Sequence, residues 1–305
     1  MRFGVMIEGQ EGVTWDDWLA LAEACERLGF ETLFRSDHYL SVTGASYRGA
    51  LDAWATVCGL GAVTSTVRLG TLVSPATFRH PSVLAKMVVT ADHISGGRVE
   101  LGIGTGWNEA EHRAYGFDFP PMRTRMDRLA EQIEIVHRSW TEETFSFRGE
   151  HWTVEDLDAR PKPVQSPHPP LLMGGSAGPR AAALAARWAD EYNVVFTSPE
   201  EAAERRERLR VACEKAGRDP ATLRFSLMHP FAVGEDDAAV AARRDRLAEQ
   251  GLSDVGRLTG TPQQIVEALR EYADVGVERV MLQHLLHRDT EALELLAAEV
   301  LPAFT

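Results

Sequence analysis

Two short stretches of the chain combine residue types that can bind an anion or move a proton. The first reads LMGGSAGPRA over residues 172–181, where an apolar run passes through glycines into a helix-like segment. Glycines let backbone N–H groups approach an anion, a helix N-terminus adds a favourable dipole, and Ser176 and Arg180 can donate to phosphate oxygens. The alternative is a tight turn with Pro179 in the first helical turn. We favour a phosphate site because glycine, serine and arginine coincide at a helix start.

The second stretch is SDHYL at residues 36–40, where Asp37 and His38 follow the strand-like run TLFRS. Histidine titrates near neutral pH, so His38 can donate or accept a proton at a cofactor or substrate. The alternative is an Asp–His pair that only organises the loop. The dipeptide by itself does not decide between the two.

A third stretch, VELGIGTGWNEAEHRAYG at residues 99–116, carries glycines at positions 102, 104 and 106. Position 107 is tryptophan, so the pattern is G-x-G-x-G and the dinucleotide-binding fingerprint G-x-G-x-x-G is absent. The strand therefore lacks side-chain bulk at Gly104 and Gly106. We predict that this bare surface lies under a flat ring, with Trp107 and Asn108 at the edge of the ring.

The polar residues that follow have a structural interpretation. Asn108 and Glu111 resemble a capping box at the start of a short helix that ends near Gly116, which assigns Glu111 a structural role. Glu109, Glu111 and His112 lack the i, i+4 spacing of metal ligands on a helix. We therefore predict no metal site.

Eight strand-like runs alternate with amphipathic segments and place these stretches at strand ends. The runs cover residues 3–7, 32–36, 68–74, 98–104, 171–175, 192–196, 223–233 and 279–285. After the fourth unit, a hairpin-like segment at 144–154 and a proline-rich segment at 159–170 interrupt the alternation. Eight such units predict an α/β fold, a closed (β/α)8 TIM-like barrel in one domain over residues 1–305, with an insertion at about 141–170. In such a barrel the chemistry lies at the C-terminal ends of the strands.

Composition limits the classes of partner. The 305 residues carry a formal net charge of -13, and this excess of acids argues against nucleic acid or an anionic membrane surface as a partner. The basic run RTRMDR at 123–128 is expected to be mostly a solvated helix face, with attraction of an anionic tail as the alternative. The N-terminus lacks the features of a signal peptide, and no run of about 18 apolar residues is present. We expect a cytoplasmic enzyme with a small-molecule substrate.

Three segments, in this order and spacing, resemble the luciferase-like flavin and deazaflavin oxidoreductases. They are GTLVSPATFRHPSVLAK (70–86), SGGRVELGIGTGWNEAEHRAYGF (95–117) and LLMGGSAGPR (171–180), and SDHYL at the second strand fits as well. The resemblance covers nearly the whole chain. It is nearest to the actinobacterial group of the luciferase-like monooxygenase family that uses the deazaflavin coenzyme F420.

The resemblance implies a TIM-like barrel, often a homodimer, with a ring system bound in the barrel mouth. It implies that Asp37 and His38 contact the polar edge of the ring or the substrate. Behind the ring it implies a bulge with a non-prolyl cis peptide, within Thr71, Leu72 and Val73. The residues implied to flank the ring are Gly104, Thr105, Gly106, Trp107 and Asn108. Those implied to hold the phosphate are Gly174, Gly175, Ser176, Ala177, Gly178 and Arg180.

The chain departs from one group of the family. The F420-dependent glucose-6-phosphate dehydrogenases have Glu where Trp107 stands and Trp where Val42 stands, so we do not expect a sugar phosphate as substrate. We predict hydride transfer between F420 and a small organic acceptor such as an activated C=C or C=N bond. His38 is the predicted proton donor or cofactor contact, and Trp107 shapes what the ring can reduce. The alternative is an FMN-dependent monooxygenase supplied by a separate flavin reductase, and the third hypothesis is a barrel that binds flavin without turnover.

Overall fold

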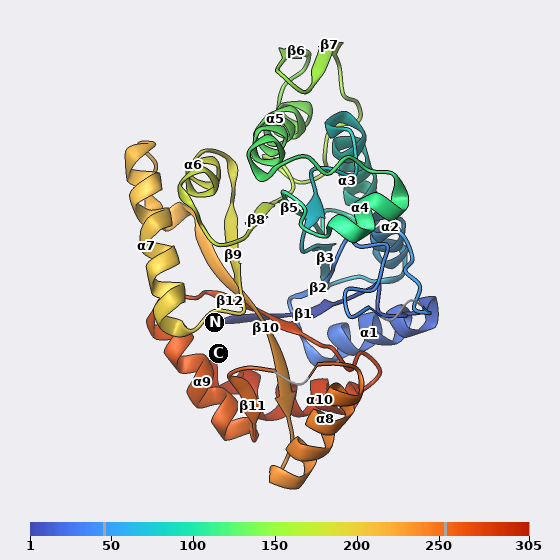
Figure 1. The fold of residues 1–305 in the computed structure, drawn as a ribbon, viewed down its shortest axis with the longest axis vertical. Helices are drawn as coiled ribbons and strands as arrows, with labels where there is room; N and C mark the ends of the chain where they lie inside the picture. Colours follow the sequence, from blue (N-terminus) through green and yellow to red (C-terminus); the bar gives the residue numbers. More distant parts are fainter. Residues whose placement is uncertain (45–46, 253–254, 305) are drawn as a thin grey trace.

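Eight parallel strands close into a barrel in the computed structural model, which describes residues 1–44, 47–252 and 255–304 (Figure 1). β1 pairs with β2 and with β12, and the order runs through β3, β5, β8, β9 and β10 back to β12. The predicted (β/α)8 barrel is therefore confirmed. The barrel strands are β1 (Arg2–Ile7), β2 (Thr32–Arg35), β3 (Arg68–Thr71), β5 (Val99–Gly104), β8 (Leu171–Gly174), β9 (Glu191–Val195), β10 (Arg224–Val233) and β12 (Arg279–Gln283).

Helices follow the strands and surround the barrel (Figure 1). Their ends obey local rules: Thr14 caps the first helix in a capping box with Asp17, and Gly29 ends it. None of the helices in the described ranges is long and apolar enough to cross a membrane. The helices are α1 (Trp15–Leu28), α2 (Ala53–Val63), α3 (Pro81–Ser95), α4 (Glu109–Tyr115), α5 (Met122–Thr141), α6 (Pro179–Trp188), α7 (Pro199–Lys215), α8 (Asp237–Glu249), α9 (Pro262–Asp274) and α10 (Thr290–Leu295). Short helical turns cover Pro220–Thr222, Leu296–Val300 and Leu301–Phe304.

Three features differ from or refine the predicted elements. The strand predicted at 68–74 is interrupted after β3, and β4 (Ser74–Pro75) resumes it; the intervening Leu72–Val73 peptide bond is cis. A short strand, β11 (Leu258–Gly260), pairs in parallel with the end of β10 and has no counterpart in the predicted pattern. The predicted hairpin forms as antiparallel β6 (Phe145–Arg148) and β7 (Thr153–Leu157), beyond the end of α5 (Figure 1).

The interior of the barrel is filled at its N-terminal end. Arg279, the first residue of β12, is fully buried and lies 2.8 Å from carboxylate oxygens of both Glu100 and Glu191. A second, apolar cluster sits inside the barrel and consists of Met6, Phe34, Leu72, Leu172, Met228 and Met281. Because charged and apolar side chains plug this end, a ligand has to enter from the C-terminal ends of the strands.

Candidate active site

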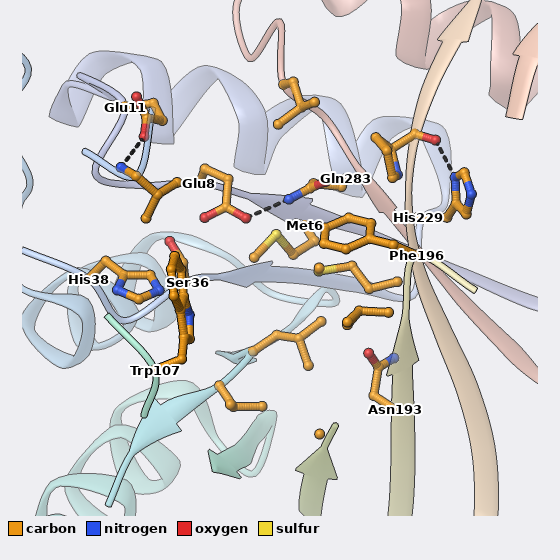
Figure 2. Close-up of a pocket in the computed structure, with 18 of the residues that line it drawn as sticks. Met6, Glu8, Glu11, Ser36, His38, Trp107, Asn193, Phe196, His229 and Gln283 are labelled. Atoms are coloured by element: carbon orange, nitrogen blue, oxygen red, sulfur yellow. Dashed lines mark hydrogen bonds between the residues drawn. The ribbon is translucent and has the colours of Figure 1, made fainter. Parts of the chain in front are cut away.

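A pocket of about 820 Å³ opens at the C-terminal ends of the barrel strands (Figure 2). Its volume lies within the usual range for small-molecule and cofactor sites. Side chains from β1, β9, β10 and β12, and from loops that include the one after β2, line it. The predicted site residues that line it are His38, Leu72, Val73, Gly104, Thr105, Gly106, Trp107, Gly174 and Gly175.

His38 is held at the rim of this pocket by a carboxylate. Its Nδ1 lies 2.8 Å from Oε2 of Glu111, whose side chain is fully buried. The indole of Trp107 packs edge-on against the His38 ring, with centroids 5.5 Å apart (Figure 2). Trp107 lines the pocket and is 63% exposed. Glu111 and Trp107 therefore fix the orientation of the imidazole and leave Nε2 as the nitrogen available for proton exchange.

The two charges of this pair reinforce each other. Burial by itself lowers the pKa of His38, but the hydrogen bond and charge of Glu111, with the nearby carboxylates of Glu8 and Asp37, raise it above its ordinary value of 6.5. For Glu111 burial has the opposite effect and raises the pKa. The hydrogen bonds from His38, Tyr39 and Leu40 outweigh burial and hold the pKa of Glu111 below 4.5. His38 therefore carries its proton more readily at neutral pH than an isolated histidine does.

The predicted capping box between Asn108 and Glu111 forms only in part, because the Glu111 side chain contacts other residues. Asn108 does cap α4, accepting a hydrogen bond from the Glu111 N–H at 3.3 Å. The Glu111 carboxylate does not return to Asn108; it accepts from the backbone N–H groups of Tyr39 and Leu40 and contacts His38. Helix α4 thus supplies the group that orients a side chain of the β2 loop, while Asn108 serves the helix and does not line the pocket.

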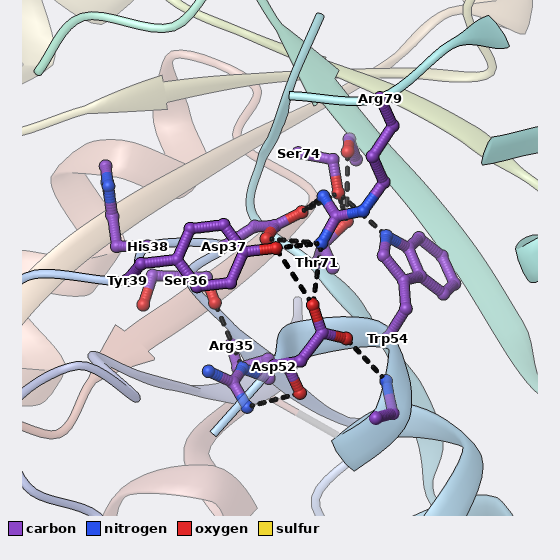
Figure 3. A network of polar contacts seen from close by, with 12 residues as sticks. Arg35, Ser36, Asp37, His38, Tyr39, Asp52, Trp54, Thr71, Ser74 and Arg79 are labelled. Carbon is purple, nitrogen blue, oxygen red and sulfur yellow. Dashed lines mark hydrogen bonds and ion pairs between the residues drawn. The ribbon is translucent and has the colours of Figure 1, made fainter. Parts of the chain in front are cut away.

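Asp37 and His38 are adjacent in sequence but have separate roles (Figure 3). Asp37 is buried; it receives two hydrogen bonds from Arg79, at 2.5 and 3.1 Å, and one from Ser74 at 2.6 Å. Arg79 also contacts Asp52 and the Tyr39 hydroxyl, each at 3.1 Å. The structure therefore does not bring Asp37 to the pocket lining, where a ring contact was expected. The Asp37 carboxylate is instead part of an ion-pair network, and this network anchors the loop that carries His38.

The alternating glycines of β5 are required by packing inside the protein, and not by a ring that lies on them as predicted. A Cβ at Gly104 would lie 2.8 Å from Cγ2 of Val73, and one at Gly102 would overlap the carbonyl oxygen of Thr71. Protein atoms of the β3–β4 link thus fill the space that the missing side chains leave. The surface that faces the pocket at this level is Val73 itself, so a flat ring would rest on Val73 and not on bare glycine.

Gly106 is needed for its backbone conformation. Its φ is 78°, in the left-handed region, and a Cβ there would approach Thr77 Oγ1 at 2.9 Å. The carbonyl oxygen of Gly106 accepts a hydrogen bond from Arg125, whose guanidinium lies 4.0 Å from the centroid of the Phe119 ring. Arg125 is 7% exposed, so the expectation of a solvated face fails at this position. It buttresses the turn that presents Trp107.

The glycine-rich turn after β8 lies at the opposite side of the pocket. Gly175 has a φ of 144°, and the Ala177 N–H donates to the Tyr192 hydroxyl at 2.9 Å, so that N–H is not free for an anion. Ser176 is exposed and Arg180 pairs with Asp127. Ser176, Ala177 and Arg180 do not line the pocket. What the turn offers to an anion is therefore mainly the N-terminus of α6, which starts after Gly178.

Comparison with known proteins identifies the family of this barrel. A family model described as luciferase-like monooxygenase matches residues 1–254. The chain belongs to the luciferase-like monooxygenase family.

Relatives of this luciferase-like chain are named as oxidoreductases. An F420-dependent hydroxymycolic acid dehydrogenase of Mycobacterium tuberculosis is 32% identical over 245 residues, which cover 79% of this chain and 65% of the relative. An F420-dependent glucose-6-phosphate dehydrogenase of Intrasporangium calvum is 28% identical over 308 residues, 91% of each chain. An FMNH2-dependent dimethylsulfone monooxygenase of Pseudomonas putida is 31% identical over 186 residues, 60% of this chain and 50% of the relative. A solved structure of an F420-dependent secondary alcohol dehydrogenase has the same fold, with a TM-score of 0.86 at 20% identity over 100% of this chain and 99% of that one.

Two polar groups of this luciferase-like pocket, Glu8 and Asn193, were not among the predicted site residues, although the sequence places Glu8 at the end of the first strand. Glu8, at the end of β1, lines it and accepts hydrogen bonds from Gln283 at 2.5 Å and Gln10 at 2.7 Å (Figure 2). Asn193, on β9, lines it from below. The position of Glu8 directly after the first strand was a usable signal, whereas Asn193 lies inside a strand and has no motif around it. No group of three metal-ligating side chains is found within the described ranges.

Proposed function

We propose that the chain is an oxidoreductase that transfers a hydride between the deazaflavin coenzyme F420 and a small organic substrate bound in the barrel mouth. The observation that carries the proposal is the arrangement around one pocket. The His38–Glu111 pair lies at its rim, and Gly174 and Gly175, which line it as well, begin the turn that leads to the uncapped N-terminus of α6. The names of the F420-dependent relatives support the choice of coenzyme. A homodimer and a cytoplasmic location stay predictions.

The start of α6 fits a phosphate. Gly178, its N-cap, has no side chain to accept from the first-turn N–H groups, and the first turn contains no acidic residue. By contrast, α1 begins with a capping box and two aspartates. The N–H groups of Arg180 and Ala181 are therefore free to hold an anion, and the helix dipole favours one there. The ring of the coenzyme would rest against Val73 and reach into the apolar interior of the pocket.

The residues of the pocket have separate tasks in such a reaction. The bound coenzyme supplies or accepts the hydride. His38 gives a proton from Nε2 to the substrate atom that gains charge, while Glu111 holds Nδ1 and stabilises the charged imidazole. Trp107 and the apolar side chains of Met6 and Met228 line the pocket, where they would pack against the bound ring and limit the access of water.

The charges around the pocket favour an uncharged or cationic substrate. Among the described residues that line it, none is lysine or arginine. Glu8 carries a negative charge that two neutral amides stabilise, and Glu11 is paired with Arg48 at 2.6 Å. An anionic substrate would therefore meet the Glu8 carboxylate in a lining without lysine or arginine, where the imidazole of His38 is already paired with Glu111. This supports an organic acceptor with an activated C=C or C=N bond, such as an enone, an unsaturated ester or an imine, over a sugar phosphate.

A second candidate function is an FMN-dependent monooxygenase supplied with reduced flavin by a separate reductase. The name of the Pseudomonas putida relative favours it. The two ring systems share their polar edge and their ribityl phosphate, so the same turn and the same pocket accommodate both.

Titration of the purified chain with F420 and with FMN, followed by turnover assays with each reduced cofactor, tests the proposal. We expect tighter binding of F420 and oxygen-independent reduction of an activated C=C or C=N acceptor. Tighter binding of FMN together with an oxygen-dependent product would contradict it, and failure to bind either would favour a barrel without turnover.

His38→Gln separates catalysis from binding. Glutamine keeps a hydrogen bond to Glu111 but cannot transfer a proton at neutral pH. We expect unchanged F420 affinity and a loss of turnover of about 100-fold or more, in the range of general acid catalysis. Trp107→Phe, which keeps an aromatic contact with the imidazole, is the matched control and should retain most of the turnover with a small acceptor.

A further inference from the structure

One buried acceptor of the pocket has no partner in the chain. Asn193 is fully buried on β9 and lines the pocket. Its Oδ1 makes no hydrogen bond to any residue that the structure describes. Figure 2 shows this oxygen on the side of the amide that faces the pocket, with the nitrogen turned the other way. Buried side-chain acceptors in folded proteins are almost always satisfied, so this oxygen is a place where a ligand donor is expected.

The orientation of the amide is set by its neighbours. The Asn193 Nδ2 donates to Oγ of Ser226 at 2.9 Å. The Ser226 hydroxyl in turn hydrogen-bonds to the carboxylate of Glu191, which Arg279 holds at 2.8 Å. A serine has a single hydroxyl hydrogen, so turning the amide over would set Oδ1 against an oxygen with no hydrogen to give. The ion pairs at the barrel floor thus keep Oδ1, an acceptor, aimed into the pocket.

The place of Asn193 relates it to the predicted cofactor site. Asn193 is paired in register with Gly174, and its carbonyl accepts the Gly175 N–H at 3.1 Å. It therefore lies on the strand beside the glycine-rich turn, next to Gly174, where a Cβ built on the glycine would lie 3.3 Å from Cγ1 of Val73. The other side chains at this depth include Met6, Leu72 and Met228, which have no strong hydrogen-bonding group.

We propose that Asn193 Oδ1 accepts the imide N–H at the pyrimidine edge of the flavin or deazaflavin ring, and that Ser226 positions Asn193 for this contact. Both ring systems carry this N–H between two carbonyl groups, so it needs an acceptor when the ring is buried. The inference rests on the proposed function and goes beyond it. It identifies which end of the ring points into the barrel, and it makes Asn193 a binding residue and Ser226 a positioning residue.

A methyl group on the imide nitrogen tests the contact directly. The probes are 5-deaza-FMN and its N3-methyl derivative, which keep the ring and the phosphate and differ only at the proposed donor. For the wild-type chain we expect the methylated compound to bind at least 10-fold more weakly in a fluorescence titration. For Asn193→Ala we expect the unmethylated compound to weaken and the difference between the two to vanish.

Two further variants separate recognition from general damage. Ser226→Ala frees the amide to turn, so we expect the discrimination between the two compounds to shrink without being abolished. Met281→Leu changes, at similar volume, a buried apolar side chain of the same barrel interior that does not line the pocket, so the full discrimination should persist. The wild-type comparison decides the question even if Asn193→Ala fails to fold.

Equal affinity of the wild-type chain for the two compounds would overturn the inference and mean that Oδ1 binds water or meets no ring. Failure of 5-deaza-FMN to bind while F420 binds normally would overturn it as well. Failure of F420 itself to bind would instead overturn the proposed function, so the two failures are distinguishable.

Discussion

Gly178→Asp places a carboxylate where the phosphate of the cofactor is predicted to bind. Gly178 has φ -62° and ψ 163°, an extended conformation open to any residue, and no heavy atom lies within 4 Å of a Cβ built there. Aspartate and asparagine are favoured helix N-caps, and replacing glycine by either changes helix stability by only a few tenths of a kcal/mol. The variant should therefore fold as the wild-type chain does while its charge opposes the phosphate.

The size of the effect follows from the hydrogen bonds at the start of α6. A cap residue at 178 would take the N–H of Arg180 or Ala181, both of which are free of side-chain caps in the structure. A hydrogen bond to a charged group contributes about 1.5–3 kcal/mol, so its loss weakens phosphate binding by roughly 10- to 100-fold. Repulsion between the two anions adds to this loss. Gly178→Asn takes the same N–H without the charge and should show a smaller effect.

The assay is a fluorescence titration of the three proteins with F420 and with a phosphate-free deazariboflavin. We expect F420 affinity to fall in the order wild type, Gly178→Asn, Gly178→Asp, and the affinity for the phosphate-free compound to stay the same in all three. An F420 affinity of Gly178→Asp within twofold of the wild type would refute the placement of the phosphate. An equal loss with the phosphate-free compound would show that the variant damages the ring site instead.

Four further outcomes follow from the geometry. Glu111→Gln removes the charge that raises the pKa of His38, so in an NMR titration the wild-type imidazole should titrate above 6.5 and the variant imidazole at lower pH. The pair stabilises the fold most between pH 4.5 and 6.5, the ordinary values of its two groups. This stabilisation declines as the pH falls through the depressed pKa of Glu111 or rises through the raised pKa of His38, which urea unfolding at several pH values checks. Gly104→Ala pushes a Cβ to 2.8 Å from the valine packed there and should destabilise the fold by about 1–3 kcal/mol, whereas Gly49→Ala, with open space around it, should not. Glu8→Gln should narrow the preference of the enzyme for the methyl ester of an unsaturated acid over the free acid, measured as a ratio of kcat/KM values; an unchanged ratio would exclude Glu8 from substrate selection.

The local elements were predictable because they depend on short-range rules. Alternating apolar runs and amphipathic segments specify strands and helices by their period. The caps at Thr14 and Asn108 involve residues three positions apart. Eight such units leave few ways to bury all the strands except a closed barrel, and closure brings the strand ends together. Closure therefore brings the loops that carry His38 and Trp107 to the same end of the barrel.

The partners of the polar side chains were not predictable in the same way. Asp37 and His38 are neighbours in sequence, but the backbone turns them to opposite sides, one toward Arg79 and one toward Glu111. Arg79 lies 42 positions from Asp37, and Glu111 lies 73 from His38. No local spacing encodes such contacts, since they arise only when the loops after different strands meet over the barrel.

The sequence by itself therefore determined the family, the barrel and the places where its chemistry gathers, because hydrophobic period, capping and turn residues act over a few positions. Tertiary structure decided which polar groups face the pocket and which form hydrogen bonds and ion pairs with other residues of the chain. In the folded chain Val73 fills the space beside Gly104, and Asp37 forms an ion pair with Arg79. The carboxylate of Glu111 contacts His38. The physical reason is that close packing and the satisfaction of buried charges are settled between segments distant in sequence.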